Sequence, residues 1–320
     1  MRFVPLKRAA GYRYSAAPDH ASQLGPNRRQ PQAMFDAYTL SQLVWIATLG
    51  LGAGTLGGML GVGGSTVIIP GLVILLGRSD GYEQHLYQAA AMIANVAVSV
   101  PAALRHRRSG AMTPTALVWM LPAALVCVML GVWLSNLSVF AGSDGGVWLG
   151  RVLALFLVYV VFANLNKLLR SPALPPNGQD QRENPDGATP GRGLTVGAVM
   201  GTIAGLLGIG GGAVAVPLQQ TLMRLPLRRC IANSSAVICV SAAVGAVYKN
   251  LSLADQPVPD GSDPLTWTAG LTLGLILAPT AWAGGRLGAS LTHRLPLRAI
   301  RWAFVGLMVV AAWKMAALPI

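Results

Sequence analysis

The stretch LGVGGSTVIIP, residues Leu60–Pro70, breaks an otherwise apolar segment with three glycines. A second copy, LGIGGGAVAVP, occupies Leu207–Pro217, so that 147 residues separate every matching position. Glycine has no side chain, tolerates positive φ and lets two backbones approach closely. The doubled break therefore predicts a chain reversal at the same point of two similar halves.

The composition is that of a protein that crosses a membrane several times. Hydrophobic residues make up 53% of the 320 residues, charged residues 11%, and the mean hydropathy is +0.53, whereas a typical soluble domain is roughly 25% charged. Most of the apolar runs approach the about 20 residues that cross a bilayer as a helix. We expect an all-α polytopic membrane protein with apolar runs at 38–60, 66–76, 88–104, 114–135, 147–169, 194–207, 213–223, 230–248, 265–285 and 299–318.

Positive charges are distributed unevenly between the connecting loops. A net charge of +13 would fit a nucleic-acid partner, but 14 of the 24 Lys and Arg residues lie in four alternate loops, at 105–113, 167–192, 224–229 and 286–301. Only four lie in the C-terminal end and the intervening loops, at 78–87, 136–151 and 249–263. This asymmetry is the positive-inside pattern of membrane proteins. It places the first four loops in the cytoplasm and predicts the lipid bilayer, not nucleic acid, as the partner.

The charge pattern also constrains the glycine breaks. The loops on either side of the second motif are both predicted inside, so the chain must enter the membrane and return there. As a helix, residues 213–223 would reach only about 16 Å, against about 30 Å of hydrocarbon. We therefore predict a glycine-rich, re-entrant or broken helical hairpin with its turn at 208–212, buried within the protein.

Applied to both motifs, this prediction makes the halves inverted repeats, each a hairpin plus three transmembrane helices, which is a common transporter construction. The N-terminal tail then lies outside. The alternative is that this tail, which carries six Lys and Arg residues, lies in the cytoplasm and that 38–76 crosses once. The predicted organisation is a polar basic tail at 1–38, a first repeat at 39–170, a cytoplasmic linker at 171–193 and a second repeat at 194–320.

The glycine turns are the candidate substrate site. The short helices that begin near Ser65–Thr66 and Gly212–Ala213 expose unpaired N–H groups and a positive dipole end, which suit an anion. Pro70 and Pro217 are expected early in these helices, where a missing N–H costs least. Neutral polar residues within the spans can donate hydrogen bonds to oxyanion oxygens. The predicted substrate-binding residues are Gly61, Gly63, Gly64, Ser65, Thr66, Asn95, Ser99, Gly208, Gly210, Gly211, Gly212, Asn233, Ser234 and Ser235. The alternative is that glycines such as Gly57 and Gly58, and the polar residues, serve helix packing.

Residue types that are missing from the apolar runs limit which substrates and functions the sequence can support. All eleven Asp and Glu residues fall in the tail or in predicted loops, whereas cation transporters need acidic groups at membrane depth. The substrate is therefore expected to be a small anion or a neutral solute. We expect no cofactor and no metal site, since the three cysteines lack metal-ligand spacing, and no P-loop, since neither motif ends in GK[ST]. His85 is placed in an outer loop, and a coupling proton is possible.

The doubled pattern G-x-L-G-[IV]-G-G-[GS]-x-[IV]-x-[IV]-P, at 58–70 and 205–217, resembles the sulfite exporter TauE/SafE family, also called the toluene-sulfonate uptake permease group. The resemblance covers about residues 39–318. It implies an inner-membrane permease for sulfite, sulfonates or other organic oxyanions, and does not set the direction of transport. Family members often carry a Thr-Ser pair after the hairpin. Ser234 and Ser235 match that pair, whereas Met92 and Ile93 stand at its place in the first half.

The sequence thus predicts a secondary transporter that holds a small oxyanion between two half-helix N-termini. A membrane-embedded enzyme is disfavoured because no His, Asp, Glu and Cys constellation lies at membrane depth. A structural or assembly protein would explain packing glycines but not two half-helix ends. The anion, the coupling ion and the oligomeric state are not specified by the sequence.

Overall fold

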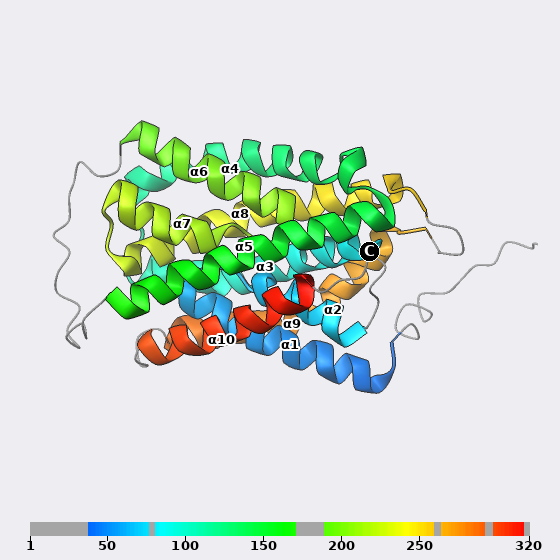
Figure 1. The fold of residues 1–320 in the computed structure, drawn as a ribbon. Helices are drawn as coiled ribbons and strands as arrows, with labels where there is room; N and C mark the ends of the chain where they lie inside the picture. The colour runs from blue at the N-terminus through cyan, green and yellow to red at the C-terminus, as the bar shows by residue number, and fades with distance from the viewer. Residues whose placement is uncertain (1–37, 77–80, 171–188, 259–263, 292–296, 317–320) are drawn as a thin grey trace, which may run out of the picture. The chain divides into compact units, whose positions relative to one another are not determined.

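Figure 1 shows the fold as a computed structural model, which describes residues 38–76, 81–170, 189–258, 264–291 and 297–316. The chain divides into two units, Met1–Tyr38 and Thr39–Ile320. The predicted N-terminal tail lies outside the described residues, and so does most of the predicted linker. The helices described below all belong to the second unit.

Each half begins with a broken helical hairpin and continues with three long helices. The helices of the first half are α1 (Leu40–Leu60), α2 (Ser65–Leu76), α3 (Gln84–Arg108), α4 (Pro114–Ser135) and α5 (Gly142–Arg170). Those of the second half are α6 (Pro190–Leu207), α7 (Gly212–Leu218), α8 (Leu227–Leu251), α9 (Trp267–Leu291) and α10 (Leu297–Ala316). The described residues contain no β-strand. The predicted all-α class is confirmed, and each half shows the predicted hairpin plus three helices.

The hairpins turn where the glycines predict. Gly61 and Gly208 end α1 and α6 in the left-handed conformation, with φ of 65° and 73°, which glycine adopts without strain. The short helices α2 and α7 then begin at Ser65 and Gly212, as expected. The helix α6 begins at Pro190, so the last residues assigned to the 171–193 linker are helical.

The two prolines lie deeper in the short helices than predicted. Pro70 and Pro217 are each the sixth residue of their helix, beyond the first four N–H groups that have no partner within a helix. The expectation that they lie early is therefore wrong. In the second half the α-helix ends one residue after Pro217 and continues as a π-helical segment, Gln219–Met223. Pro70 occupies the same position of α2, which nevertheless continues as an α-helix to Leu76.

Glycines along one face of α1 and one face of α6 bring each of these helices into backbone contact with a helix of the opposite half. In Figure 1, α6 lies along α4, and α1 packs on α9. The glycines on these faces recur every four residues and match between the halves: Gly50, Gly54 and Gly58 in α1, and Gly197, Gly201 and Gly205 in α6. A Cβ on Gly58 would lie 2.5 Å from the Gly285 carbonyl oxygen, and one on Gly201 would lie 2.5 Å from that of Ala124. The packing role proposed for Gly58 fits these contacts.

The contacts also give the directions of the helices. Gly54 lies at Ala281 and Gly58 at Gly285, so α1 and α9 run parallel. By the same reasoning α6 and α4 run parallel, because Gly197 lies at Met120 and Gly201 at Ala124. The helix α3 begins where α8 ends, so these two helices run antiparallel, with their ends joined by a hydrogen bond between His85 and Lys249.

Five described helices are long and apolar enough to cross a membrane: α1, α3, α4, α5 and α8. Large apolar side chains on their surfaces are exposed, with Leu155 at 72% and Trp45 at 61%. Large apolar side chains exposed on helices of this kind suit contact with lipid. The hairpin helix α2, Ser65–Leu76, is apolar but shorter than a full crossing requires.

A leucine at Gly58 is expected to lower the stability of the protein by about 1–3 kcal/mol, because its side chain would push α1 away from the α9 backbone. Gly52→Leu on the same helix is the matched control, since a Cβ there has nothing within 4 Å. Thermal unfolding of both variants in detergent micelles measures the difference. Equal unfolding temperatures would contradict the close contact at Gly58.

Candidate substrate site

The two glycine turns, residues 61–64 and 208–211, lie against each other. A Cβ on Gly63 would lie 3.4 Å from the Ile209 carbonyl oxygen, and one on Gly212 would collide with the Gly61 carbonyl oxygen. A Cβ on Gly61 would lie 2.9 Å from the Ile231 Cα in α8. Gly61 and Gly212 have no room for a Cβ, so glycine is required there for the contact between the halves, whereas Gly63 favours glycine because of its positive φ of 87°.

Asn95 of α3 connects both turns to the start of α2. Its Oδ1 accepts a hydrogen bond from the Ser65 backbone N–H at 3.0 Å, and its Nδ2 donates to the Ser65 hydroxyl at 2.6 Å. A Cβ on Gly63 or on Gly210 would lie within 3.0 Å of the Asn95 amide. Asn95 and Ser65 are fully buried. The N-terminus of α2, predicted to face an anion, is therefore occupied by a neutral side chain in this conformation.

Two further predicted residues beside this contact form hydrogen bonds close to their own backbone. The Thr66 hydroxyl donates to the Gly63 carbonyl at 3.3 Å, which closes the first turn. The Ser99 hydroxyl donates to the Asn95 carbonyl one turn earlier in α3, at 2.7 Å. Both bonds are local, so they fix the hairpin and the helix that carries Asn95.

The predicted polar residues of the second half form a separate buried cluster. Asn233 donates to Gln219 Oε1 at 3.1 Å and accepts a hydrogen bond from the Thr113 backbone N–H at 2.9 Å. The Gln219 amide donates to the Ser234 hydroxyl at 2.9 Å, and the Ser235 hydroxyl donates to the Ile231 carbonyl. The cluster links the π-helical segment to α8 and to the start of α4. None of these side chains lines the cavity described next.

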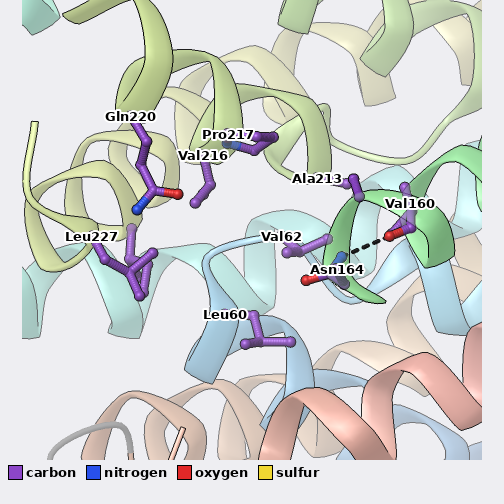
Figure 2. Close-up of a pocket in the computed structure, with 11 residues that line it drawn as sticks. Leu60, Val62, Val160, Asn164, Ala213, Val216, Pro217, Gln220 and Leu227 are labelled. Atoms are coloured by element: carbon purple, nitrogen blue, oxygen red, sulfur yellow. Dashed lines mark hydrogen bonds between the residues drawn. The ribbon is translucent and has the colours of Figure 1, made fainter. Parts of the chain in front are cut away.

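A cavity of about 40 Å³ lies beside the two turns (Figure 2). The first turn and its preceding helix contribute Leu60 and Val62, and α7 contributes three further residues to the lining. The only polar side chains in the lining are Asn164 and Gln220, and Figure 2 marks the hydrogen bond from Asn164 to the Val160 carbonyl, 2.8 Å long. The full lining is Leu60, Val62, Val160, Ala163, Asn164, Ala213, Val216, Pro217, Gln220, Leu227 and Ile231.

No predicted substrate-binding residue lines this cavity, although Val62 and Ala213 are chain neighbours of Gly61 and Gly212. The sequence analysis missed Asn164, which lies within the apolar run at 147–169. An amide inside a membrane span is itself a signal that could have selected it. Gln220 carries the same signal, since it is an amide three residues after Pro217, within the apolar run at 213–223.

Two charged or titratable residues that the sequence placed in loops lie inside helices. His85 is in the first turn of α3 and Lys249 in the last turn of α8, and both side chains are fully buried. The assignment of His85 to an outer loop is therefore wrong. Burial of these residues was missed because the apolar run at 88–104 begins after α3 does, and the run at 230–248 ends before α8 does.

The described residues contain no group of three or more His, Cys, Asp or Glu side chains that could hold a metal ion. The described carboxylates lie at the ends of elements: Glu83 precedes α3, Asp144 is in the first turn of α5, and Asp255 ends the short helix that follows α8. The cavity is therefore lined by apolar and neutral side chains.

Comparison with known proteins agrees with this architecture. The model of the sulfite exporter TauE/SafE family matches residues 46–315. The chain belongs to this family. The resemblance drawn from the doubled glycine motif is thus confirmed, and the TauE/SafE match spans both hairpins.

Several TauE/SafE-like relatives are named as probable membrane transporter proteins. Over 88% of its own length, the chain is 27% identical to MamO of Magnetospirillum gryphiswaldense. It is 25% identical to YunE of Bacillus subtilis over 80% of its own length, and 28% identical to a protein of Haemophilus influenzae over 82%. It spans 46% of the length of that MamO, 91% of YunE and 94% of the Haemophilus protein. No solved structure matches the chain. The protein is therefore a multi-pass membrane protein of a transporter family.

Asn95→Leu is expected to destabilise the protein by about 1–3 kcal/mol, because the Ser65 backbone N–H would stay buried without an acceptor. Ser99→Ala, one turn away on α3, is the control. Its hydroxyl donates to carbonyls of its own helix and also contacts the Cys239 thiol, so its removal leaves no backbone N–H unpaired and should have a small effect. Thermal unfolding in detergent compares the stability of the two variants. Equal stability would contradict the bridging role of Asn95.

Proposed function

We propose that the protein is a secondary transporter that moves a small sulfur-containing or organic oxyanion, such as sulfite or a sulfonate, across the inner membrane. The observation that carries this proposal is the contact of two glycine turns, one from each half, beside a cavity lined by both halves. Transporters of the inverted-repeat type place their substrate near such a junction. The TauE/SafE membership supports the same class of function.

The substrate is proposed to bind in the cavity beside the turns. The space directly between them is filled by backbone, because Gly212 packs on Gly61 and Val62. Ala213 is the second residue of α7 and lines the cavity, and the first N–H groups of a helix have no partner within that helix. Together with the amides of Asn164 and Gln220, this backbone offers neutral hydrogen-bond donors to an oxyanion. The absence of a carboxylate from the lining favours an anion over a cation.

The halves are proposed to be inverted repeats that rock around this cavity. Two observations support this: α1 runs parallel to α9 while α6 runs parallel to α4, and α3 and α8 run antiparallel. The start of α1 then lies at the same end as the start of α9, which follows a loop that the charge pattern predicts to be outside. This supports the proposal that the N-terminal tail is also outside. A phosphatase or fluorescent fusion to residue 1 that reports a cytoplasmic end would overturn this arrangement.

The transport proposal can be tested with purified protein in liposomes. Flux is measured for sulfite, an aromatic sulfonate, a carboxylate and, for comparison, a cation, each with and without a proton gradient. Saturable flux of one or more oxyanions is expected, and dependence on the gradient would identify a coupling proton. Protein that inserts correctly but moves none of the anions would favour a structural or assembly role instead.

Ala213→Leu should reduce oxyanion flux by about tenfold or more, because the larger side chain fills the proposed binding space; that loss corresponds to about 1.4 kcal/mol. Ala254→Leu makes the same change at an exposed position outside the cavity lining and is the matched control. Size-exclusion profiles verify that both variants fold. Wild-type flux in folded Ala213→Leu would place the substrate elsewhere.

A further inference from the structure

Lys249 lies in the last turn of α8 with no exposed surface, and its ammonium group makes three hydrogen bonds. The Nζ atom lies 2.7 Å from His85 Nδ1, 2.8 Å from the Ser135 hydroxyl and 2.8 Å from Asn136 Oδ1. His85 comes from the start of α3, and Ser135 and Asn136 come from the end of α4. Every bond therefore joins the second half of the chain to the first.

The directions of the hydrogen bonds fit a protonated lysine. His85 Nε2 lies 2.7 Å from the Phe140 carbonyl, which can only accept, so Nε2 carries the proton and Nδ1 accepts from Lys249. The Ser135 hydroxyl donates to the Val132 carbonyl and thus also accepts from Lys249. An ammonium has three N–H donors, and all three are used here.

None of the three partners of Lys249 is a carboxylate. Buried charges in proteins are normally paired with an opposite charge or a metal, because burial removes their hydration. The acidic residue just before α3, Glu83, accepts a hydrogen bond from the Tyr87 hydroxyl. When Lys249 is protonated, these three hydrogen-bond partners therefore solvate its charge but do not neutralise it.

Asn136 is the partner through which this charge can be reached. His85 and Ser135 are buried, whereas Asn136 is partly exposed. Its side chain is held by Ser252, which accepts from Nδ2 at 2.8 Å, and by Gln256, which donates to Oδ1 at 3.3 Å. The Oε1 atom of Gln256 is buried without a partner. A ligand would therefore have to displace Asn136 to reach Lys249.

We propose that Lys249 is a second binding site for the transported oxyanion, at the end of the helices predicted to face outward. An oxyanion replaces Asn136 on the ammonium and accepts its hydrogen bond next to His85 and Ser135. This site is distinct from the cavity, whose lining contains none of these residues. The inference rests on the proposed transport of oxyanions, and it adds the group that recognises their charge.

Two substitutions test the charge and its accessibility separately. Lys249→Gln removes the charge, whereas Asn136→Asp keeps Lys249 and places a fixed carboxylate where the oxyanion would bind. The aspartate can still accept from Lys249 and Gln256, so this variant should fold even if Lys249→Gln does not. Lys314→Gln is the control, because it removes an exposed lysine from the end of α10.

Binding is measured first, in detergent, as the rise in unfolding temperature caused by sodium sulfite or sodium benzenesulfonate, since a ligand that binds the folded state stabilises it. The wild type and Lys314→Gln should be stabilised. Asn136→Asp and Lys249→Gln are combined with Ala213→Leu, which fills the cavity that is also proposed to bind the anion. Relative to Ala213→Leu alone, the anion concentration for half-maximal effect should rise about tenfold or more in the folded double variants, or the effect should vanish. A parallel arm with phosphatidylglycerol tests a lipid phosphate, and stabilisation by that lipid alone would overturn the proposal for a soluble oxyanion.

Flux in proteoliposomes then separates this inference from the transport proposal. If the wild type moves oxyanions and Asn136→Asp does so with unchanged half-saturation, the Lys249 site is wrong and the transport proposal stands. If the wild type moves none but is stabilised through Lys249, the protein binds oxyanions without transporting them and the transport proposal fails. Equal anion stabilisation of Ala213→Leu alone and of its combination with Asn136→Asp would overturn the Lys249 site whatever the flux.

Discussion

The structure depends on how two chain reversals find hydrogen-bond partners for their backbone N–H and C=O groups inside a lipid-facing helical protein. Lipid offers no hydrogen bonds, so each N–H and C=O at a break must find its partner within the protein. Here the two turns are placed against each other, with Gly212 on the Gly61 carbonyl, and Asn95 supplies an acceptor for the first N–H of α2. Close approach requires glycine at the contact, which explains why the motif occurs twice.

The same constraint makes the halves interdependent. The glycine face of α1 contacts α9 from the other half, and the glycine face of α6 contacts α4. The polar groups are nevertheless arranged differently in the two halves. Asn95 occupies the start of α2, whereas Gln219, Asn233 and Ser234 bond to one another away from the start of α7. The cavity accordingly adjoins α7, and the asymmetry of the site follows from the position of these amides.

The fold was largely predictable because its decisive signals are local or periodic. The glycine motif alone gives the helix starts at Ser65 and Gly212, and hydropathy gives the long helices. The site was predictable only in part, because the sequence does not show that Asn95 reaches Ser65 rather than the substrate. His85 and Lys249 escaped notice for a different reason. A charged or titratable residue at the end of an apolar run is assigned to a loop. Tertiary contacts can nevertheless extend the helix past that residue and bury its side chain.

The proposed division between the two sites has a physical rationale. A transported anion must bind well enough to enter but weakly enough to leave. An unneutralised ammonium attracts an anion strongly, so a charge placed within the cavity would retain the substrate. Neutral amides and helix N–H groups bind it more weakly and allow release. Placing Lys249 at one end of the helices, and only neutral donors such as Asn164 and Gln220 in the cavity, separates charge selection from release.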